Sequence, residues 1–131
     1  MHRRFVTTGA ILGAIAVAFG AFGAHGLKKI VDAETVQTFQ TGVQYQMYHS
    51  LALLLTGLLY EKCDQRFTRI AGVLFITGIF LFSGSLYILT AGRVAENTSI
   101  DKAGIITPFG GISFIAAWLF LFLAVIRANK N

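Results

Sequence analysis

Residues 104–126 read GIITPFGGISFIAAWLFLFLAVI, a run of 23 residues without a charged side chain. Residues 5–24 and 70–92 are also uncharged, while residues 45–60 form a shorter apolar run that contains one ionisable side chain, His49. A helix rises 1.5 Å per residue, so about 20 apolar residues cross the roughly 30 Å hydrocarbon core of a bilayer. Lipid offers no hydrogen-bond partner to the backbone, which makes a helix the expected form of each run.

The sequence therefore predicts an all-α integral membrane protein, a four-helix transmembrane bundle. Hydrophobic residues make up 55% of the chain and charged residues 13%, against about 25% charged residues in an ordinary soluble domain. The longest segment outside the apolar runs, residues 25–44, is too short for a separate soluble domain. We expect one membrane domain over residues 1–131, with spans at about 5–24, 43–60, 70–92 and 105–126.

Basic residues predict the orientation, because lysine and arginine favour cytoplasmic loops. With four spans, seven basic residues lie on the side of the termini and four on the other side. The first group is Arg3, Arg4, Lys62, Arg66, Arg69, Arg127 and Lys130, and the second is Lys28, Lys29, Arg93 and Lys102. We therefore expect both termini in the cytoplasm. The net charge of +5 has this source, and we expect no nucleic-acid partner.

A cleaved signal peptide is the alternative interpretation of the first apolar segment. The segment follows two arginines and ends in small residues, as a signal peptide does. Its apolar run of 20 residues is longer than the roughly 7–15 residues of a typical signal core. We therefore expect the segment to be a membrane span.

Glycines at helical spacing predict close packing of the spans. In lipid, helices associate largely through van der Waals contact at small residues, because there is little hydrophobic drive between them. The expected packing positions are Gly9, Gly13, Gly20, Gly23, Gly78 and Gly110. Thr107 and Pro108 predict the start of the last helix, with the threonine as its N-cap.

The first external loop contains a pattern typical of an amphipathic helix. After Asp32, a plausible N-cap, the apolar residues Val36, Phe39 and Val43 follow at helical spacing beside a stripe of glutamines. We expect a short helix at the membrane interface, which bends near Gly42 into the second span.

The predicted orientation places most polar side chains of the spans in the outer half of the bundle. The candidate binding residues are His25, Gln44, His49, Ser83, Ser85 and Ser113. An ionisable residue inside a span is costly and suggests a functional site, which draws attention to His49. The structural alternative is a neutral imidazole that bonds to Ser83 or Ser85 and holds two helices together.

The same inventory argues against catalysis. No Asp or Glu lies within a span, and two histidines are too few for a catalytic zinc site. A serine–histidine pair would lack an orienting acid. Cys63 is the only cysteine, so no internal disulfide or redox pair can form. We expect no catalytic residue, no metal and no cofactor.

Four strings in order carry a family resemblance: GAFGAHGL at 20–27, YQMYHSLA at 45–52, LFSGSLY at 81–87 and TPFGGISF at 107–114. The chain resembles the small membrane-protein family called domain of unknown function 423, to which animal transmembrane protein 256 is related. The resemblance implies four spans, a bacterial inner-membrane location and no established biochemical activity. It also implies that these residues belong to signature strings: His25, His49, Ser83, Ser85, Pro108 and Gly110.

Two functional hypotheses remain open at this point. The first is a non-enzymatic bundle that binds lipid or protein through an outward-facing polar pocket around His49. Its partners would be membrane lipid, partner membrane helices or a second copy in a homo-oligomer. The alternative is a small transporter or channel component in which His49 acts as a gate or proton relay.

Overall fold

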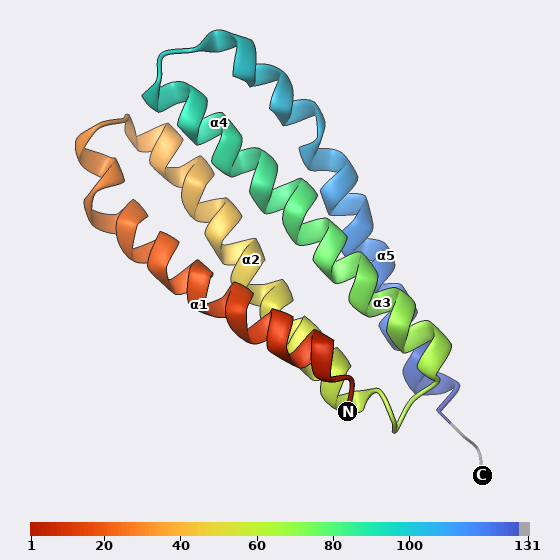
Figure 1. Ribbon diagram of the computed structural model, residues 1–131. Coiled ribbons are helices and arrows are strands. Elements are labelled where there is room, and N and C mark those ends of the chain that lie inside the picture. Colours follow the sequence, from red (N-terminus) through yellow and green to blue (C-terminus); the bar gives the residue numbers. More distant parts are fainter. Residues whose placement is uncertain (129–131) are drawn as a thin grey trace.

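The computed structural model describes residues 1–128, and in this range every regular element is a helix. The α-helices are α1 (Arg3–His25), α2 (Ala33–Leu59), α3 (Gln65–Gly78), α4 (Gly84–Val94) and α5 (Thr107–Ile126). A π-helical segment, Ile79–Ser83, joins α3 to α4, so the two form one rod of 30 residues, Gln65–Val94. Four helical rods thus run alternately up and down (Figure 1), which confirms the predicted all-α class.

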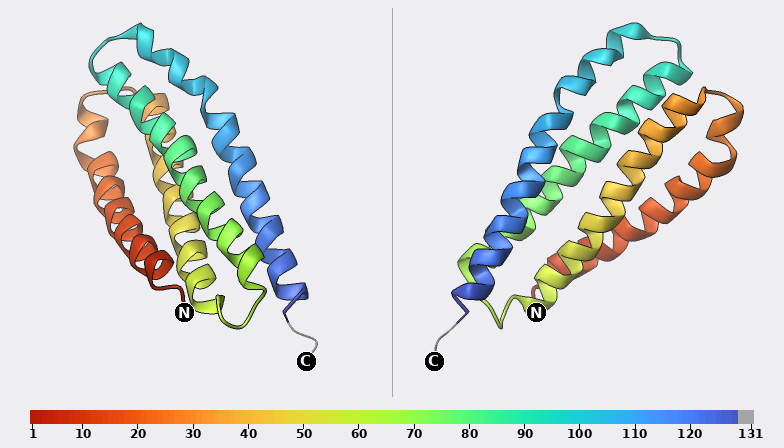
Figure 2. Two further views of the ribbon diagram at one scale, coloured as in Figure 1. Left: turned by 45° about the vertical axis from the view of Figure 1, so that its right-hand side comes forward. Right: turned by 180° about the vertical axis from the view of Figure 1, so that it is seen from behind.

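The rods form two hairpins that lie side by side. In one hairpin α1 packs against α2, and in the other α3 packs against α5, while α2 also contacts α3 and α4. Residues 1–4, 59–66 and 126–128 meet at one end, which we call the basic end (Figure 2). The 3₁₀ segments Leu27–Lys29 and Thr98–Ile105 lie at the opposite end. Lys130, used above for the orientation, lies outside the described residues.

Side-chain caps begin α2 and α3. The Asp32 carboxylate accepts a hydrogen bond from the Thr35 amide at 2.8 Å. Hydrogen bonding by Thr35, through its side chain and its amide, holds the pKa of Asp32 below its usual value. Asp64 accepts from the amides of Arg66 and Phe67 at 3.0 and 3.1 Å. Each aspartate satisfies amides that the first helical turn leaves without a partner.

The separate interfacial helix predicted for the first external loop is not observed. Residues 33–42 are the first turns of α2, which continues without interruption to Leu59. Gly42 does not bend the helix but permits close packing: a Cβ atom there would lie 3.0 Å from the Tyr87 ring. Its carbonyl also accepts a hydrogen bond from Ser83 at 2.6 Å. The position of these turns relative to the membrane interface remains a prediction.

The last helix starts near the predicted residue but is capped differently. Thr107 is already the first residue of α5, and Ile106 precedes it without a side-chain cap. The Thr107 hydroxyl lies 2.5 Å from the Ser85 hydroxyl on α4. The threonine therefore links two helices instead of capping one.

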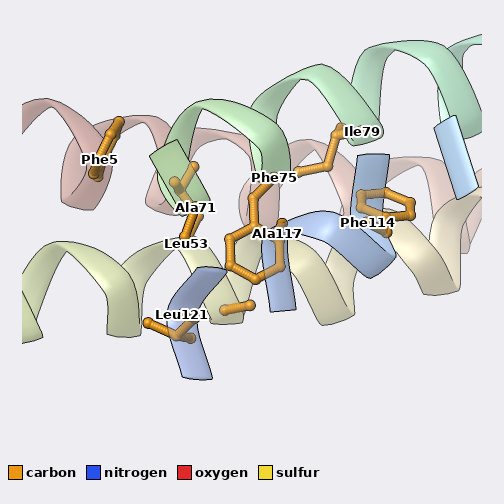
Figure 3. Packing of buried hydrophobic residues seen from close by; sticks show 9 residues of the cluster. Phe5, Leu53, Ala71, Phe75, Ile79, Phe114, Ala117 and Leu121 are labelled. Carbon is orange, nitrogen blue, oxygen red and sulfur yellow. The ribbon is translucent and has the colours of Figure 1, made fainter. Parts of the chain in front are cut away.

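The bundle has an apolar core, and much of its outer surface is apolar as well. Phe75 on α3 is fully buried at the centre of the main core, together with Phe5, Ala52, Leu53, Ala71, Ile79, Phe114, Ala117 and Leu121 (Figure 3). Large apolar side chains such as Phe109 and Phe122 are more than half exposed. Three helices, Arg3–Lys29, Gln65–Val94 and Thr98–Ile126, are long and apolar enough to cross a membrane. The fourth, α2, is as long but carries more polar residues.

Two of the predicted packing glycines face backbone of the neighbouring helix. A Cβ atom at Gly110 would lie 2.4 Å from the Phe82 nitrogen in the π-helical segment, and one at Gly9 would lie 2.9 Å from the Ser50 carbonyl oxygen. Gly23 and Gly78 meet side chains within 3.0 Å, whereas Gly13 and Gly20 have no neighbour closer than 4.0 and 3.4 Å. Among the six predicted glycines, Gly9 and Gly110 therefore come closest to the backbone of a neighbouring helix.

Candidate functional site

His49 lies in the middle of α2 and is 5% exposed. Its Nδ1 atom is 2.6 Å from the Tyr45 carbonyl oxygen, and its Nε2 atom accepts a hydrogen bond from Trp118 Nε1 at 3.2 Å. Since the tryptophan can only donate, Nε2 must be the unprotonated nitrogen and Nδ1–H must donate to Tyr45. A neutral imidazole in this one tautomer satisfies both partners.

Aromatic rings enclose the imidazole. Phe114 stacks on it at 3.5 Å between ring centroids with an interplanar angle of 9°, while Tyr45, Phe75 and Trp118 lie 5.8–6.0 Å away. We call these five residues, His49, Tyr45, Phe75, Phe114 and Trp118, the His49 cluster. They come from α2, α3 and α5, so the cluster joins the two hairpins.

The predicted pocket around His49 gains no support from this geometry. The ring is packed on its faces and bonded at both nitrogens. The expected serine partner was wrong, because Trp118 holds the position predicted for Ser83 or Ser85. No sequence motif singled out Trp118, whose indole N–H is a donor that needs an acceptor inside an apolar helix bundle.

The three candidate serines bond to backbone or to a threonine, away from His49. Ser83 donates to the Gly42 carbonyl at 2.6 Å, and Ser113 donates to the Leu74 carbonyl at 2.8 Å. Ser85 donates to the Phe82 carbonyl at 2.8 Å besides its contact with Thr107. The remaining candidates, His25 and Gln44, are exposed. The six residues therefore do not form one site.

A buried glutamine that is not among the six candidate residues bonds to two neighbouring helices. Gln46 is 2% exposed. Its Nε2 donates to the Leu12 carbonyl on α1 at 2.8 Å, and its Oε1 accepts from the Tyr87 hydroxyl on α4 at 2.7 Å. One side chain thus ties three helices together. The sequence could have indicated Gln46, because this polar residue precedes His49 by one helical turn and so lies on the same helix face.

All of these polar groups are internally satisfied. Within residues 1–128, every buried side-chain nitrogen or oxygen atom has a hydrogen-bond partner. An open binding or catalytic site would be expected to leave some polar group available to a ligand. Gln46, His49, Ser83 and Ser113 therefore act as contacts between helices.

A cavity of a different character opens at the basic end. It has a volume of about 790 Å³ and lies between the start of α1 and the start of α3, beside the end of α2. We call it the basic cleft. Its lining includes three arginines, one acid and three apolar side chains: Arg3, Arg4, Arg69, Glu61, Phe5, Val73 and Ile76.

A smaller cavity adjoins the basic cleft, and we call it the side hollow. It has a volume of about 450 Å³ and is lined by Tyr60, Gln65, Arg66, Arg69 and Ile70. Tyr60, Gln65 and Arg69 line both cavities. Arg69 Nη2 donates a hydrogen bond to the Tyr60 hydroxyl at 2.8 Å, so this pair lies at the boundary between them.

The arginines of the basic end are not neutralised by neighbouring acids. In the described chain this end has six Lys and Arg side chains but two acidic ones, while the opposite end has four of each. Glu61 pairs with the Met1 amino group at 2.5 Å, and this pairing lowers the pKa of the glutamate. Asp64 is occupied as the cap of α3. Between residues 1 and 128 no ion pair joins these arginines to a carboxylate.

Comparison with known proteins agrees with the helical membrane architecture. Residues 19–111 match the family model described as protein of unknown function (DUF423). The chain is 43% identical to UPF0382 membrane protein YwdK of Bacillus subtilis, over 94% of this chain and 96% of the relative. It is 36% identical to UPF0382 inner membrane protein YgdD of Escherichia coli, over 93% and 88% of the two chains. No solved structure matches it. With a family match over most of its length and relatives aligned nearly end to end, this chain belongs to the DUF423 family of membrane proteins.

Proposed function

We propose that this protein is a non-enzymatic, lipid-binding bundle of the bacterial inner membrane, with four spans and both termini in the cytoplasm. The observation that carries the proposal is the basic cleft, which combines arginines at the end of the bundle with an apolar wall. Such a cavity suits an amphiphile, a molecule with an anionic head and apolar chains.

Internal hydrogen bonding supports α2 as the fourth span. The hydroxyls of Ser50 and Thr56 bond to carbonyls of their own helix at 2.6 and 2.7 Å. Gln46 and His49 bond to neighbouring helices. These polar side chains therefore add little cost to placing α2 in lipid, because none of them needs water as a partner.

The charge difference between the two ends supports the orientation. The basic end has six Lys and Arg side chains in the described part, and the opposite end has four. Positively charged segments are retained in the cytoplasm. The basic cleft would then face the cytoplasmic leaflet, whose surface is rich in anionic lipid.

The polar groups inside the bundle support a non-enzymatic role. Both nitrogens of His49 have partners within the protein, so the ring offers no free nitrogen to a substrate or to a moving proton. The alternative of a gate or proton relay at His49 gains no support from this arrangement. We assign His49 instead to the junction between the hairpins.

The walls of the basic cleft suit the two parts of a phospholipid. Arg3 and Arg4 begin α1, where the headgroup phosphate of a surrounding lipid would lie. Val73 and Ile76 continue the cleft along α3 away from the start of that helix. Arginine is suited to the head because its planar guanidinium donates two parallel hydrogen bonds to phosphate.

Native mass spectrometry of the full chain, released from membranes in mild detergent, tests the proposal. The wild type should retain phospholipid, and the triple variant Arg3→Gln, Arg4→Gln, Arg69→Gln should lose it. A control with the same change in charge at the opposite end, Lys28→Gln, Lys29→Gln, Lys102→Gln, should retain lipid like the wild type. Lipid-free wild type, or equal loss in both triple variants, would refute binding at the cleft.

A further inference from the structure

We infer that the lipid bound at the basic end carries two phosphate groups, one in the basic cleft and one in the side hollow. The inference rests on the proposed lipid-binding function and specifies the class of lipid. It follows from the position of Arg69, which lines both cavities.

Tyr60 holds Arg69 at this boundary. The tyrosine hydroxyl accepts from one guanidinium nitrogen of Arg69 at 2.8 Å. A guanidinium has five N–H donors, so this bond leaves donors for groups on both sides. Tyr60 itself lines both cavities, and its bond restricts a side chain that would otherwise be mobile at the surface.

Each cavity has its own arginine besides the shared one. Arg3 and Arg4 from α1 line the basic cleft, and Arg66 from α3 lines the side hollow. Each of the two phosphates on one molecule would contact an arginine of its own cavity. Both phosphates would also contact Arg69. A lipid with a single phosphate would leave the cation of one cavity without a counter-charge.

Each of the two cavities also has apolar residues, as the acyl chains of a lipid require. Along α3, Arg66, Arg69, Val73 and Ile76 follow at spacings of three, four and three, which places them on one helix face. The face thus begins with arginines and continues with apolar side chains. Ile70 gives the side hollow an apolar residue of its own. Two heads with separate chains fit this arrangement better than one head.

The four arginines have the charge to match such a ligand. They are Arg3, Arg4, Arg66 and Arg69. Of the two acids of this end, Glu61 lines the basic cleft but is paired with the N-terminal amine, and Asp64 caps the start of α3. Two phosphates carry about two negative charges on one molecule. Charge-assisted hydrogen bonds of arginine to phosphate are the strong class of such bonds.

The experiment compares two lipids at equal total phosphate. Full-length protein in mild detergent is mixed with either cardiolipin, which has two phosphates, or phosphatidylglycerol, which has one, and the bound fraction is measured by native mass spectrometry. We expect cardiolipin to bind about tenfold more tightly, equivalent to about 1.4 kcal/mol. Arg66→Gln should abolish this preference while phosphatidylglycerol binding persists, and Lys62→Gln, a neighbouring change of equal charge, should leave the preference intact.

The possible failures are distinguishable. Equal binding of the two lipids by the wild type would overturn the two-phosphate inference but leave lipid binding at the cleft in place. An unchanged preference in Arg66→Gln would also overturn it, because the side hollow would then not contribute. Binding of neither lipid would remove the proposed function together with the inference.

Discussion

The half of the bundle around His49 and Gln46, which we call the closed half, and the basic end use polar side chains in opposite ways. In the first region, polar atoms are buried and bonded to one another or to backbone, as in the contact of Gln46 with Leu12 and Tyr87. At the basic end, Arg3, Arg4 and Arg66 are exposed and border open cavities. The difference teaches that polarity inside a span is a poor guide to a binding site unless some polar group is left without a partner.

The physical cause lies in the surroundings of each region. In hydrocarbon an unsatisfied polar group costs several kcal/mol, so a stable bundle pairs each one internally. At the membrane surface, water and lipid headgroups can solvate a cation, and arginines without acidic partners remain stable there. The first region therefore stabilises the fold, and the second remains available to a ligand.

The largest expected effect tests how rigid the closed half is. Gly110→Ala should lower the free energy of unfolding by about 3 kcal/mol, at the upper end of the usual cost of overpacking. The reason is that its Cβ atom would lie 2.4 Å from the Phe82 backbone nitrogen, which cannot move away as a flexible side chain can. Unfolding by sodium dodecyl sulfate in mixed micelles measures the change.

Gly111→Ala is the matched control for this substitution. Gly111 is the next residue of α5, and a Cβ atom there would meet nothing within 4 Å. Alanine favours a helix over glycine by up to about 1 kcal/mol, so the control should be neutral or slightly stabilising. If both variants behaved alike, α5 would not pack tightly against the π-helical segment.

The next effect concerns the buried glutamine. Gln46→Leu should destabilise the protein by about 1–2 kcal/mol, because hydrogen bonds between membrane helices contribute about 0.6 kcal/mol on average and the Tyr87 hydroxyl would lose its acceptor. Gln44→Leu, on the exposed side of the same helix, should change stability little. A larger loss from Gln44→Leu would show that the closed half has been assigned to the wrong face of α2.

Much of the fold was predictable because lipid imposes one rule on every span. Uncharged runs located the helices. The predicted first and last spans, 5–24 and 105–126, start and end within two residues of α1 and α5. The helix that contains the predicted second span, α2, begins ten residues before that span, because its start is set by the Asp32 cap and not by apolar residues. Hydropathy cannot show how far a helix extends beyond the membrane core.

The site was less predictable, and the reason is again physical. Sequence shows which polar residues occupy a span but not whether they find partners, and Trp118 Nε1 satisfies His49 from 69 residues away. In the sequence, the arginines of the basic end indicate only the orientation of the chain. That Arg66 and Arg69 border cavities next to the start of α1 depends on how the hairpins pack.

A double-mutant cycle sharpens the assignment of His49 to the closed half. His49→Leu and Trp118→Phe each remove one partner of the hydrogen bond between α2 and α5. We expect a coupling free energy of about 0.6 kcal/mol between them, the average for hydrogen bonds between membrane helices. The same unfolding assay measures it. If the losses in free energy of unfolding were strictly additive, the two side chains would not interact. That result would favour the pocket interpretation of His49.

The smallest change in intrinsic stability is expected at the basic end, and it is the most informative for function. Arg69→Gln should alter the free energy of unfolding of lipid-free protein by less than about 0.5 kcal/mol, as exposed substitutions usually do. Anionic lipid should raise the melting temperature of the wild type, because a ligand that binds only the folded state stabilises it. That rise should be largely absent in Arg69→Gln and should shrink with added salt in the wild type. If lipid-free Arg69→Gln unfolded as readily as Gly110→Ala, the arginine would be a structural contact, and the contrast between the two regions would fail.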